Sequence, residues 1–387
     1  MTIASTPMGT LRGVRSGEVT AFKGVRYAAP ARRFAASEPA LPWEGVLDAT
    51  RPGTSAPQRP GRMAWVPGLE IDPATGGEDC LYLNVWTTGT EGHRPVLVFL
   101  HGGAYVFGSG AQAMYDGAAL ARDHGLVVVS VNYRFGVTGF WYGGAVPANL
   151  ALRDQIAALE WVRGNIGAFG GDPGSVTLAG HSAGGTSVLA LMTCTAGLFE
   201  RAAAMSPVPY GFATPAEATA WTGATGIPDP FAAGLDELLA GEGVAVRAQA
   251  PLGGLLPVGP VIDGELLPEH PMTAGLPPMP LLVTTTAEEG RLFDAIGMAH
   301  AGTEAIFTGP ADELVRAHKG RARHVVCDFR SPMSHNGVEL GACHLVDVPL
   351  YFGNHGTPLT GSGPEAAERS AAMSEDFARF CRGEEAV

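Results

Sequence analysis

Continuous apolar runs alternate with helical patterns through the middle of the chain. Residues 95–103 and 125–134 are unbroken and rich in β-branched side chains, as strands buried on both faces of a parallel sheet are. Residues 112–125 between them carry a helical pattern, and apolar residues recur at helical spacing over about 149–165. This alternation predicts an α/β fold with a mostly parallel central sheet flanked by helices.

The same alternation continues toward the C-terminus. Residues 175–180 predict a strand that leads directly into a helix over about 183–193. Three later segments, 201–207, 279–290 and 323–330, each predict a strand that ends in a polar loop. Since parallel strands end at one edge of a sheet, polar residues after these strands are candidates for a common site.

The two ends of the chain and one internal segment have other patterns. Residues 10–28 alternate and turn at RSGE, which predicts an antiparallel hairpin, and Phe377 belongs to a last amphipathic helix. The segment from about 207 to 278 is rich in Ala, Gly and Pro, with one predicted helix near 231–240. We expect a single catalytic domain over 1–387, with a small cap-like excursion at about 207–278.

Composition narrows the class of protein. The net charge of −13 opposes binding to nucleic acid. The N-terminal residues lack a signal-peptide pattern, and no apolar run is long enough to span a membrane. The five cysteines have no paired spacing. We therefore expect reduced thiols and a cytoplasmic location.

The sequence AGHSAGG contains the first candidate for chemistry. Ser182 stands between a predicted strand and a predicted helix, with Gly180 and Gly184 two residues away on either side. A nucleophile elbow needs this setting, because the strained turn that exposes a serine leaves no room for neighbouring side chains. Small residues at a tight turn are the structural alternative. The strand–turn–helix order favours a nucleophile.

A serine nucleophile needs a base and an orienting acid, which in this fold follow the serine in the order acid, then histidine. Glu288 and Glu289 follow the strand PLLVTTT (280–286), and Glu289 lies 289 − 182 = 107 residues after the serine. His335 and His344 both follow the strand at 323–330. Spacing alone does not choose between these two histidines.

The sequence FLHGGAYVFGSG (99–110) directly follows a buried strand. Its His-Gly-Gly-Ala fits the loop that supplies backbone N–H groups to an oxyanion in lipases and esterases. No Gly-Lys-Ser/Thr phosphate loop and no zinc spacing of Cys and His occur in the sequence, so we expect no cofactor and no metal.

Several long blocks resemble one known family. GGEDCLYLNVW, HGGAYVFGSG, VNYRFGVTGF, NIGAFGGDPGSVTLAG and GACHLVDVPLYFGN are together similar to the type-B carboxylesterases, relatives of the cholinesterases. The resemblance runs from GVRYAAPARRF almost to the last helix, and it indicates a shortened bacterial-type member. It implies the α/β-hydrolase fold and hydrolysis of carboxylic esters, with a small-molecule ester as the partner.

The resemblance also assigns roles to individual residues. It implies Ser182 as nucleophile, Glu289 as acid and His344, rather than His335, as base. The matching oxyanion hole uses the backbone N–H groups of three residues, namely Gly103, Ala104 and Ala183. Arg33 and Glu78 match a salt bridge of the family that ties the N-terminal region to the core.

Three features depart from the family pattern. His181 stands where glutamate is usual. One interpretation is that this position tolerates variation. The other is that His181 adds, beside the triad, a group that titrates near neutral pH. Cys80 has no upstream cysteine to bridge with. The chain is short between about 206 and 278 and between 293 and 324, which predicts an open, shallow acyl site, covered by a partner subunit if a homo-oligomer forms.

Two other readings stay open at this stage. The same triad hydrolyses amides, carbamates or lactones in other proteins, and the sequence does not separate these substrates from esters. A non-catalytic binding protein on the same fold is disfavoured, because all three triad positions are filled.

Overall fold

The computed structural model describes residues 2–29, 32–61, 63–71 and 75–384. Its main feature is a sheet of eleven strands with the order β1-β2-β3-β5-β7-β6-β8-β9-β10-β11, to which β4 is added beside β2. The strands are β1 (Thr2–Thr6), β2 (Gly9–Ser16), β3 (Val19–Arg26), β4 (Val46–Asp48), β5 (Tyr82–Thr87), β6 (Arg94–Leu100), β7 (Val127–Val131), β8 (Gly171–His181), β9 (Arg201–Met205), β10 (Leu281–Thr286) and β11 (Ala322–Cys327).

The sheet is parallel where the sequence predicts it to be. β7, β6, β8, β9, β10 and β11 are all parallel neighbours, whereas β2, β3 and β5 join the sheet in antiparallel fashion. The predicted N-terminal hairpin is confirmed as β2 and β3. Because the parallel strands share one direction, the loops after β6, β8, β9 and β10 meet at one edge of the sheet.

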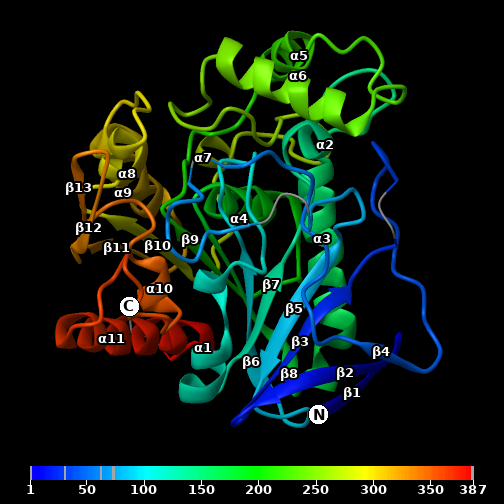
Figure 1. Ribbon diagram of the computed structural model, residues 1–387, viewed down its shortest axis with the longest axis vertical. Helices are drawn as coiled ribbons and strands as arrows, with labels where there is room; N and C mark the ends of the chain where they lie inside the picture. The colour runs from blue at the N-terminus through cyan, green and yellow to red at the C-terminus, as the bar shows by residue number, and fades with distance from the viewer. Residues whose placement is uncertain (1, 30–31, 62, 72–74, 385–387) are drawn as a thin grey trace.

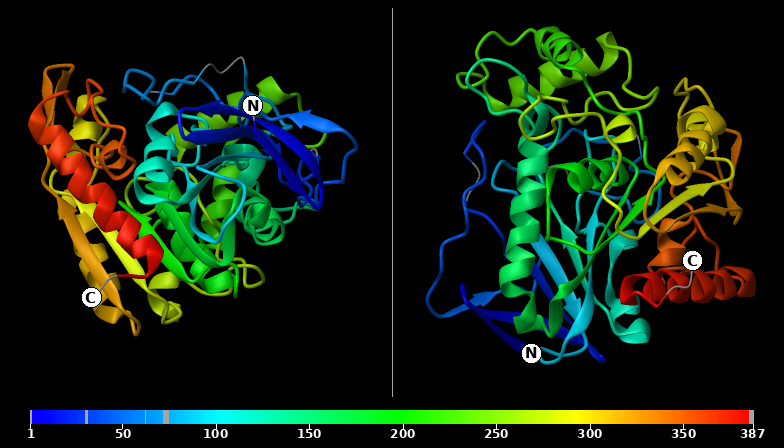
Figure 2. Two further views of the ribbon diagram at one scale, coloured as in Figure 1. Left: turned by 90° about the horizontal axis from the view of Figure 1, so that it is seen from below. Right: turned by 180° about the vertical axis from the view of Figure 1, so that it is seen from behind.

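Helices cover both faces of this sheet. The helices beside the sheet include α1 (Ala118–His124), α3 (Leu150–Asn165), α4 (Ala183–Cys194), α9 (Gly309–Ala317) and α11 (Pro364–Arg382). Helix α1 packs with α11 on one face, and α3 packs with α4 on the other (Figures 1 and 2). The shorter helices are α2 (Gly136–Phe140), α7 (Pro271–Ala274), α8 (Gly290–Ala295) and α10 (Val348–Tyr351).

The segment expected to form a cap contains more helix than the sequence analysis predicted. Helix α6 (Leu235–Ala248) extends the predicted helix, and α5 (Pro215–Ala224), which we did not predict, packs against it. Both lie at the top of Figure 1. Thr214 and Glu217 form a capping box at the start of α5, a signal that was readable in the sequence. The division into one domain with a cap-like excursion stays a prediction.

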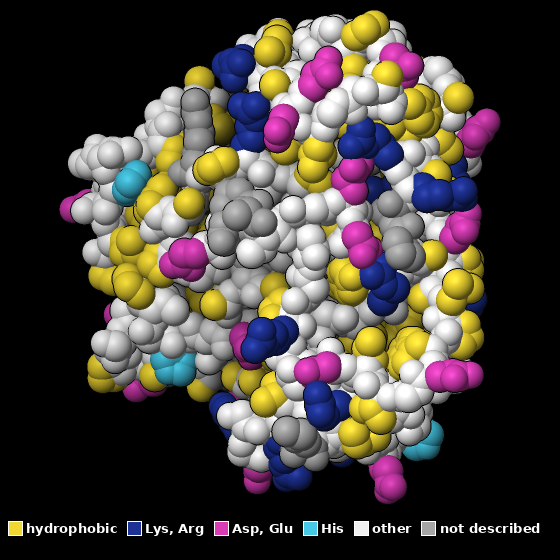
Figure 3. All heavy atoms as spheres, turned by 45° about the vertical axis from the view of Figure 1, so that its right-hand side comes forward, with side chains coloured by type: hydrophobic (Ala, Val, Ile, Leu, Met, Phe, Trp, Pro, Cys, Tyr) yellow, Lys and Arg dark blue, Asp and Glu magenta, His cyan; other side chains and the backbone are white. Residues whose placement is uncertain are grey.

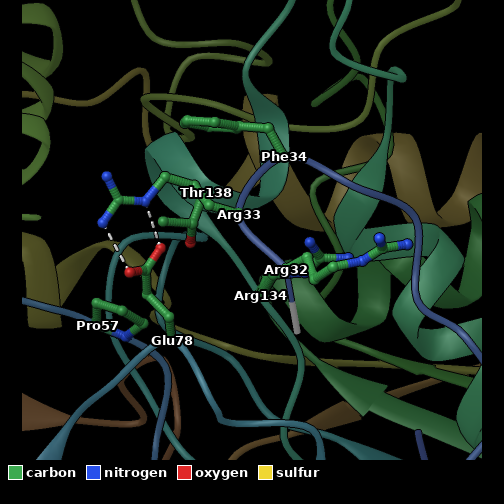
Figure 4. A pocket seen from close by; sticks show the side chains of 7 residues that line it. All are labelled: Arg32, Arg33, Phe34, Pro57, Glu78, Arg134 and Thr138. Carbon is green, nitrogen blue, oxygen red and sulfur yellow. Dashed lines mark hydrogen bonds and ion pairs between the residues drawn. The ribbon is translucent and has the colours of Figure 1, made fainter. Parts of the chain in front are cut away.

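The predicted Arg33–Glu78 salt bridge is present (Figure 4). The guanidinium meets the carboxylate through two hydrogen bonds, of 2.6 and 2.7 Å, and donates a third to the Ala233 carbonyl oxygen. Nearby, Arg134 and Asp154 form a buried bidentate pair. The N-terminal region is thus fixed both to the segment before β5 and to the segment before α6.

The surface carries both signs of charge. On the face in Figure 3, basic and acidic side chains are interspersed rather than separated by sign. Over the described residues, no helix has the length and apolar character that crossing a membrane requires.

Candidate active site

Ser182 occupies a sharp turn between β8 and α4. Its backbone has φ 57° and ψ −120°, outside the regions that a non-glycine residue normally adopts. Its N–H donates to the Met205 carbonyl oxygen on β9, at 2.8 Å, and its own carbonyl accepts from Thr186 on α4. The strain is therefore held by the sheet on one side and by the helix on the other.

Two glycines make this turn possible. A Cβ on Gly180 would lie 2.4 Å from the Gly184 carbonyl oxygen, and a Cβ on Gly184 would lie 2.1 Å from the Leu100 carbonyl oxygen. Both distances are far below van der Waals contact. The small residues on either side of Ser182 are thus required by close backbone packing, as the elbow pattern predicts.

Glu289 and His344 are brought together from two separate loops. His344 Nδ1 lies 2.5 Å from Glu289 Oε2, and neither residue is more than 5% exposed. The other carboxylate oxygen of Glu289 accepts from the Ser206 hydroxyl at 2.7 Å and from the Thr286 N–H at 2.8 Å. These donors fix the carboxylate, which in turn fixes the orientation of the imidazole.

The imidazole of His344 lies in an aromatic surrounding. The rings of Phe293 and Phe307 are each 5.2 Å from it, and the ring of His181 is 4.6 Å away. Because His181 directly precedes Ser182, this contact places His344 beside the elbow. Ser206, Phe293 and Phe307 were not predicted; Ser206 alone had a sequence signal, since it follows a strand that ends at the same edge.

His181 does not behave as the sharper hypothesis expected. Its side chain is 1% exposed, and neither ring nitrogen has a hydrogen-bond partner among the described residues. Burial, followed by the neighbouring His344, lowers the pKa of His181 well below its usual value. This direction opposes the hypothesis that His181 titrates near neutral pH, which the pH dependence of catalysis would test.

The loop after β6 lies directly against the elbow. A Cβ on Gly102 would lie 3.1 Å from Ser182 Cβ, so this backbone passes the serine closely. The next residues adopt positive φ, with 123° at Gly103 and 52° at Ala104. Within the described chain, no hydrogen bond engages the N–H groups of Gly103, Ala104 or Ala183. They are available to an acceptor from outside.

The other candidates from the sequence lie elsewhere. Glu288 pairs with Arg291 and Arg330 and accepts from the Ala342 N–H, so it braces the loop beneath Glu289. His335 stacks on Trp65 and has no contact with Glu289. Of the two acids and two histidines that spacing left open, Glu289 and His344 are the two that a hydrogen bond joins.

A further buried carboxylate, Asp347, was not predicted. It is fully buried, and Oδ1 has no hydrogen-bond partner among the described residues. Burial, followed by the charge of Glu289, raises the pKa of Asp347 to about 7. Asp347 is thus a second buried acid close to Glu289 and His344.

The nucleophile and the base proposed from the sequence are both buried. Ser182 is 6% exposed and His344 is 5% exposed within a single chain. These values describe two residues and not the acyl site, so the open acyl site covered by a partner subunit stays a prediction.

Comparison with known proteins identifies the family. Residues 1–306 match the carboxylesterase family, and the chain therefore belongs to it. The class of protein is that of carboxylic ester hydrolases with the α/β-hydrolase fold. His344 lies beyond the matched residues, so its placement rests on the contact with Glu289.

Bacterial relatives and solved structures agree with this class. The chain is 38% identical to the para-nitrobenzyl esterase of Bacillus subtilis over 75% of its length, and spans 63% of that protein. It is 34% identical to phenmedipham hydrolase of Pseudarthrobacter oxydans over 91% of its length and 83% of that protein. The carboxylesterase EST55 of Geobacillus stearothermophilus superposes with a TM-score of 0.83 at 29% identity, covering 100% of this chain and 91% of that one.

Proposed function

We propose that this protein hydrolyses carboxylic esters of small molecules through an acyl-enzyme on Ser182. The hydrogen bond between His344 Nδ1 and Glu289 carries the proposal. It leaves Nε2 as the free nitrogen of a histidine that lies beside the elbow. Nε2 then takes the Ser182 proton as the oxygen attacks the ester carbonyl, and returns it to the leaving alcohol.

Glu289 stabilises the imidazolium that forms during this step. Its carboxylate is buried and holds two further donors, so it is already oriented before substrate arrives. Water then attacks the acyl-enzyme, with His344 as the base a second time.

The N–H groups of Gly103, Ala104 and Ala183 are the proposed oxyanion hole. Their freedom from other hydrogen bonds within the described chain supports this role, as does the close approach of Gly102 to Ser182. Ala183 is also the first residue of α4, where the aligned peptide dipoles favour negative charge.

The test is covalent labelling combined with turnover. A fluorophosphonate should form a single adduct on Ser182, and Ser182→Ala should lose both the adduct and the hydrolysis of p-nitrophenyl acetate. Ser334→Ala, which removes an exposed serine on β12 (Ser331–His335), should keep both. An unlabelled Ser182 in the unaltered protein would overturn the proposal and favour a non-catalytic binding protein.

Hydrolysis of amides or carbamates by the same triad is a second candidate. The chain is 34% identical, over 91% of its length, to a probable N-octanoylanthranilate hydrolase of Rhodococcus erythropolis, whose name denotes an N-acyl substrate. Comparing kcat/KM for a matched ester, anilide and carbamate of one acyl group tests this. A larger value for the anilide or the carbamate would favour the second candidate. The cytoplasmic location and the oligomeric state stay predictions.

A further inference from the structure

Two aromatic side chains far apart in the sequence stack face to face. The ring centroids of Trp65 and His335 lie 3.7 Å apart, and the ring planes differ by 2°. Trp65 belongs to the segment between β4 and β5. His335 ends β12, which pairs with β13 (Val338–Gly341) in a hairpin. The stack therefore joins two separate parts of the chain.

The segment that holds Trp65 is fixed to the proposed oxyanion loop. Gln58 exchanges hydrogen bonds with the backbone of Gly108, at 2.9 and 3.0 Å, and Gln112 donates to the Leu69 carbonyl oxygen at 2.8 Å. Trp65 lies between these two anchors. Figure 1 shows this blue segment before β5 passing in front of α4, the helix that begins after Ser182.

The hairpin that holds His335 is fixed to the loops of the acid and the base. Asn336 donates to the Ala295 carbonyl oxygen at 2.9 Å, at the end of the helix that starts after Glu289. The Ala342 N–H donates to Glu288 at 2.9 Å, and two residues later the chain reaches His344. The hairpin is thus fixed to the segments that hold Glu289 and His344, whereas the segment of Trp65 is fixed to the loop after β6.

We propose that the Trp65–His335 stack is a strap across the approach to Ser182 that limits the size of the ester admitted. The stack joins the segment fixed to the loop after β6, which lies against Ser182, to the hairpin fixed to the loops of Glu289 and His344, and Ser182 itself is only 6% exposed. A bulky ester reaches the serine only when the two rings separate, whereas a small ester passes beside them. The inference rests on the proposed function, because it concerns access to the same serine.

The expected size of the effect follows from the strength of aromatic stacking. A stacked pair shifts an opening equilibrium by about three- to tenfold. Removing either ring should raise the fraction of open protein by that factor. Because the two rings act as one contact, removing both should do no more than removing one.

The experiment compares two esters with the same leaving group, p-nitrophenyl acetate and the bulkier p-nitrophenyl 2-naphthoate. In Trp65→Ala and in His335→Ala, the ratio of kcat/KM for the naphthoate to that for the acetate should rise about three- to tenfold. The double variant should match the single ones. His93→Ala, an exposed histidine before β6, is the control and should keep the ratio of the unaltered protein.

Further variants separate the strap from a loss of folding. Trp65→Phe retains an aromatic ring and should keep the ratio within about twofold of the unaltered protein. His335→Ala alters a hairpin at the surface, and its thermal midpoint should stay unchanged. An unchanged ratio in both alanine variants, or a double variant equal to the product of the single effects, would overturn the strap. A lack of turnover of both esters by the unaltered protein would instead remove the proposed function, and the strap with it.

Discussion

The imidazole rings of His181 and His344 lie 4.6 Å apart, with an angle of 41° between their planes. One ring is held by Glu289, and the other has no hydrogen-bond partner among the described residues. Burial, followed by the neighbouring His344, lowers the pKa of His181 well below its usual value. We therefore expect His181 to stay uncharged beside His344.

His181→Gln should leave the pH dependence of catalysis unchanged. The pKa of His181 is lowered well below neutrality, so its charge does not change over the pH range in which the enzyme would work. The acid limb of kcat/KM in the variant should superimpose on that of the unaltered protein. A shift of that limb to higher or lower pH would contradict the expectation that His181 stays uncharged. Glu18→Gln, at an exposed acid in the turn between β2 and β3, is the control.

Glu289→Gln should lower kcat by about 10³- to 10⁴-fold with little change in KM. The amide keeps the shape of the side chain but lacks the negative charge that stabilises the imidazolium of His344. Steady-state kinetics with p-nitrophenyl acetate measure this effect. Glu288→Gln provides a neighbouring control, since that acid pairs with arginines and not with His344. Equal losses in both variants would argue against Glu289 as the acid.

Ser206→Ala should lower kcat by about tenfold. The variant removes the hydroxyl that donates to Glu289 at 2.7 Å, while the Thr286 N–H and His344 still hold the carboxylate. In the Glu289→Gln background the same change should have a much smaller effect, because the charge that it orients is absent. Additive losses in the double variant would show that Ser206 acts independently of Glu289.

Gly103→Ala should abolish activity and lower the thermal midpoint. The backbone of Gly103 has φ 123°, and a Cβ there would lie 1.8 Å from the Phe107 carbonyl oxygen. The loop would have to move, and with it the proposed oxyanion donors. Gly164→Ala, in α3 with open space around the position, should instead be neutral or stabilising. Full activity in Gly103→Ala would exclude the oxyanion role of this loop.

Glu242→Gln should reduce the dependence of stability on pH. Burial raises the pKa of Glu242 to about 7, while the unfolded chain ionises near 4.5, so the folded state holds the proton more tightly. Stability therefore falls as pH rises from 4.5 to 7, by up to about 3 kcal/mol for this group.

Urea unfolding at pH 5 and pH 7.5 measures the effect at Glu242. The loss of unfolding free energy between these pH values should be smaller in Glu242→Gln, and unchanged in Glu237→Gln, an exposed acid on the same helix. Asp347 contributes a loss of the same sign, so some pH dependence should remain. Equal losses in all three proteins would contradict the prediction.

The elbow shows how much of the site local sequence specifies. Gly180 and Gly184 meet across one strand–turn–helix unit, so the local pattern of small residues predicted the turn, while β6 and β9 add further contacts to Gly184 and Ser182. The parallel sheet was predictable for a similar reason, because strands buried on both faces consist of continuous apolar runs. Helix α5 was missed because its Ala- and Gly-rich sequence has little amphipathic pattern, although its capping box was present.

The sequence by itself determined the fold class, the elbow and the order of the acid and the base along the chain. The resemblance to the family added the choice of His344, which spacing had left open. Only the tertiary structure decided which groups meet: that Glu289 binds His344 and Ser206, that His335 stacks on Trp65, and that His181 is buried without a partner. The physical reason is that strand order and burial bring together residues from distant loops. Their pKa values and access to solvent depend on that surrounding, which no local pattern encodes.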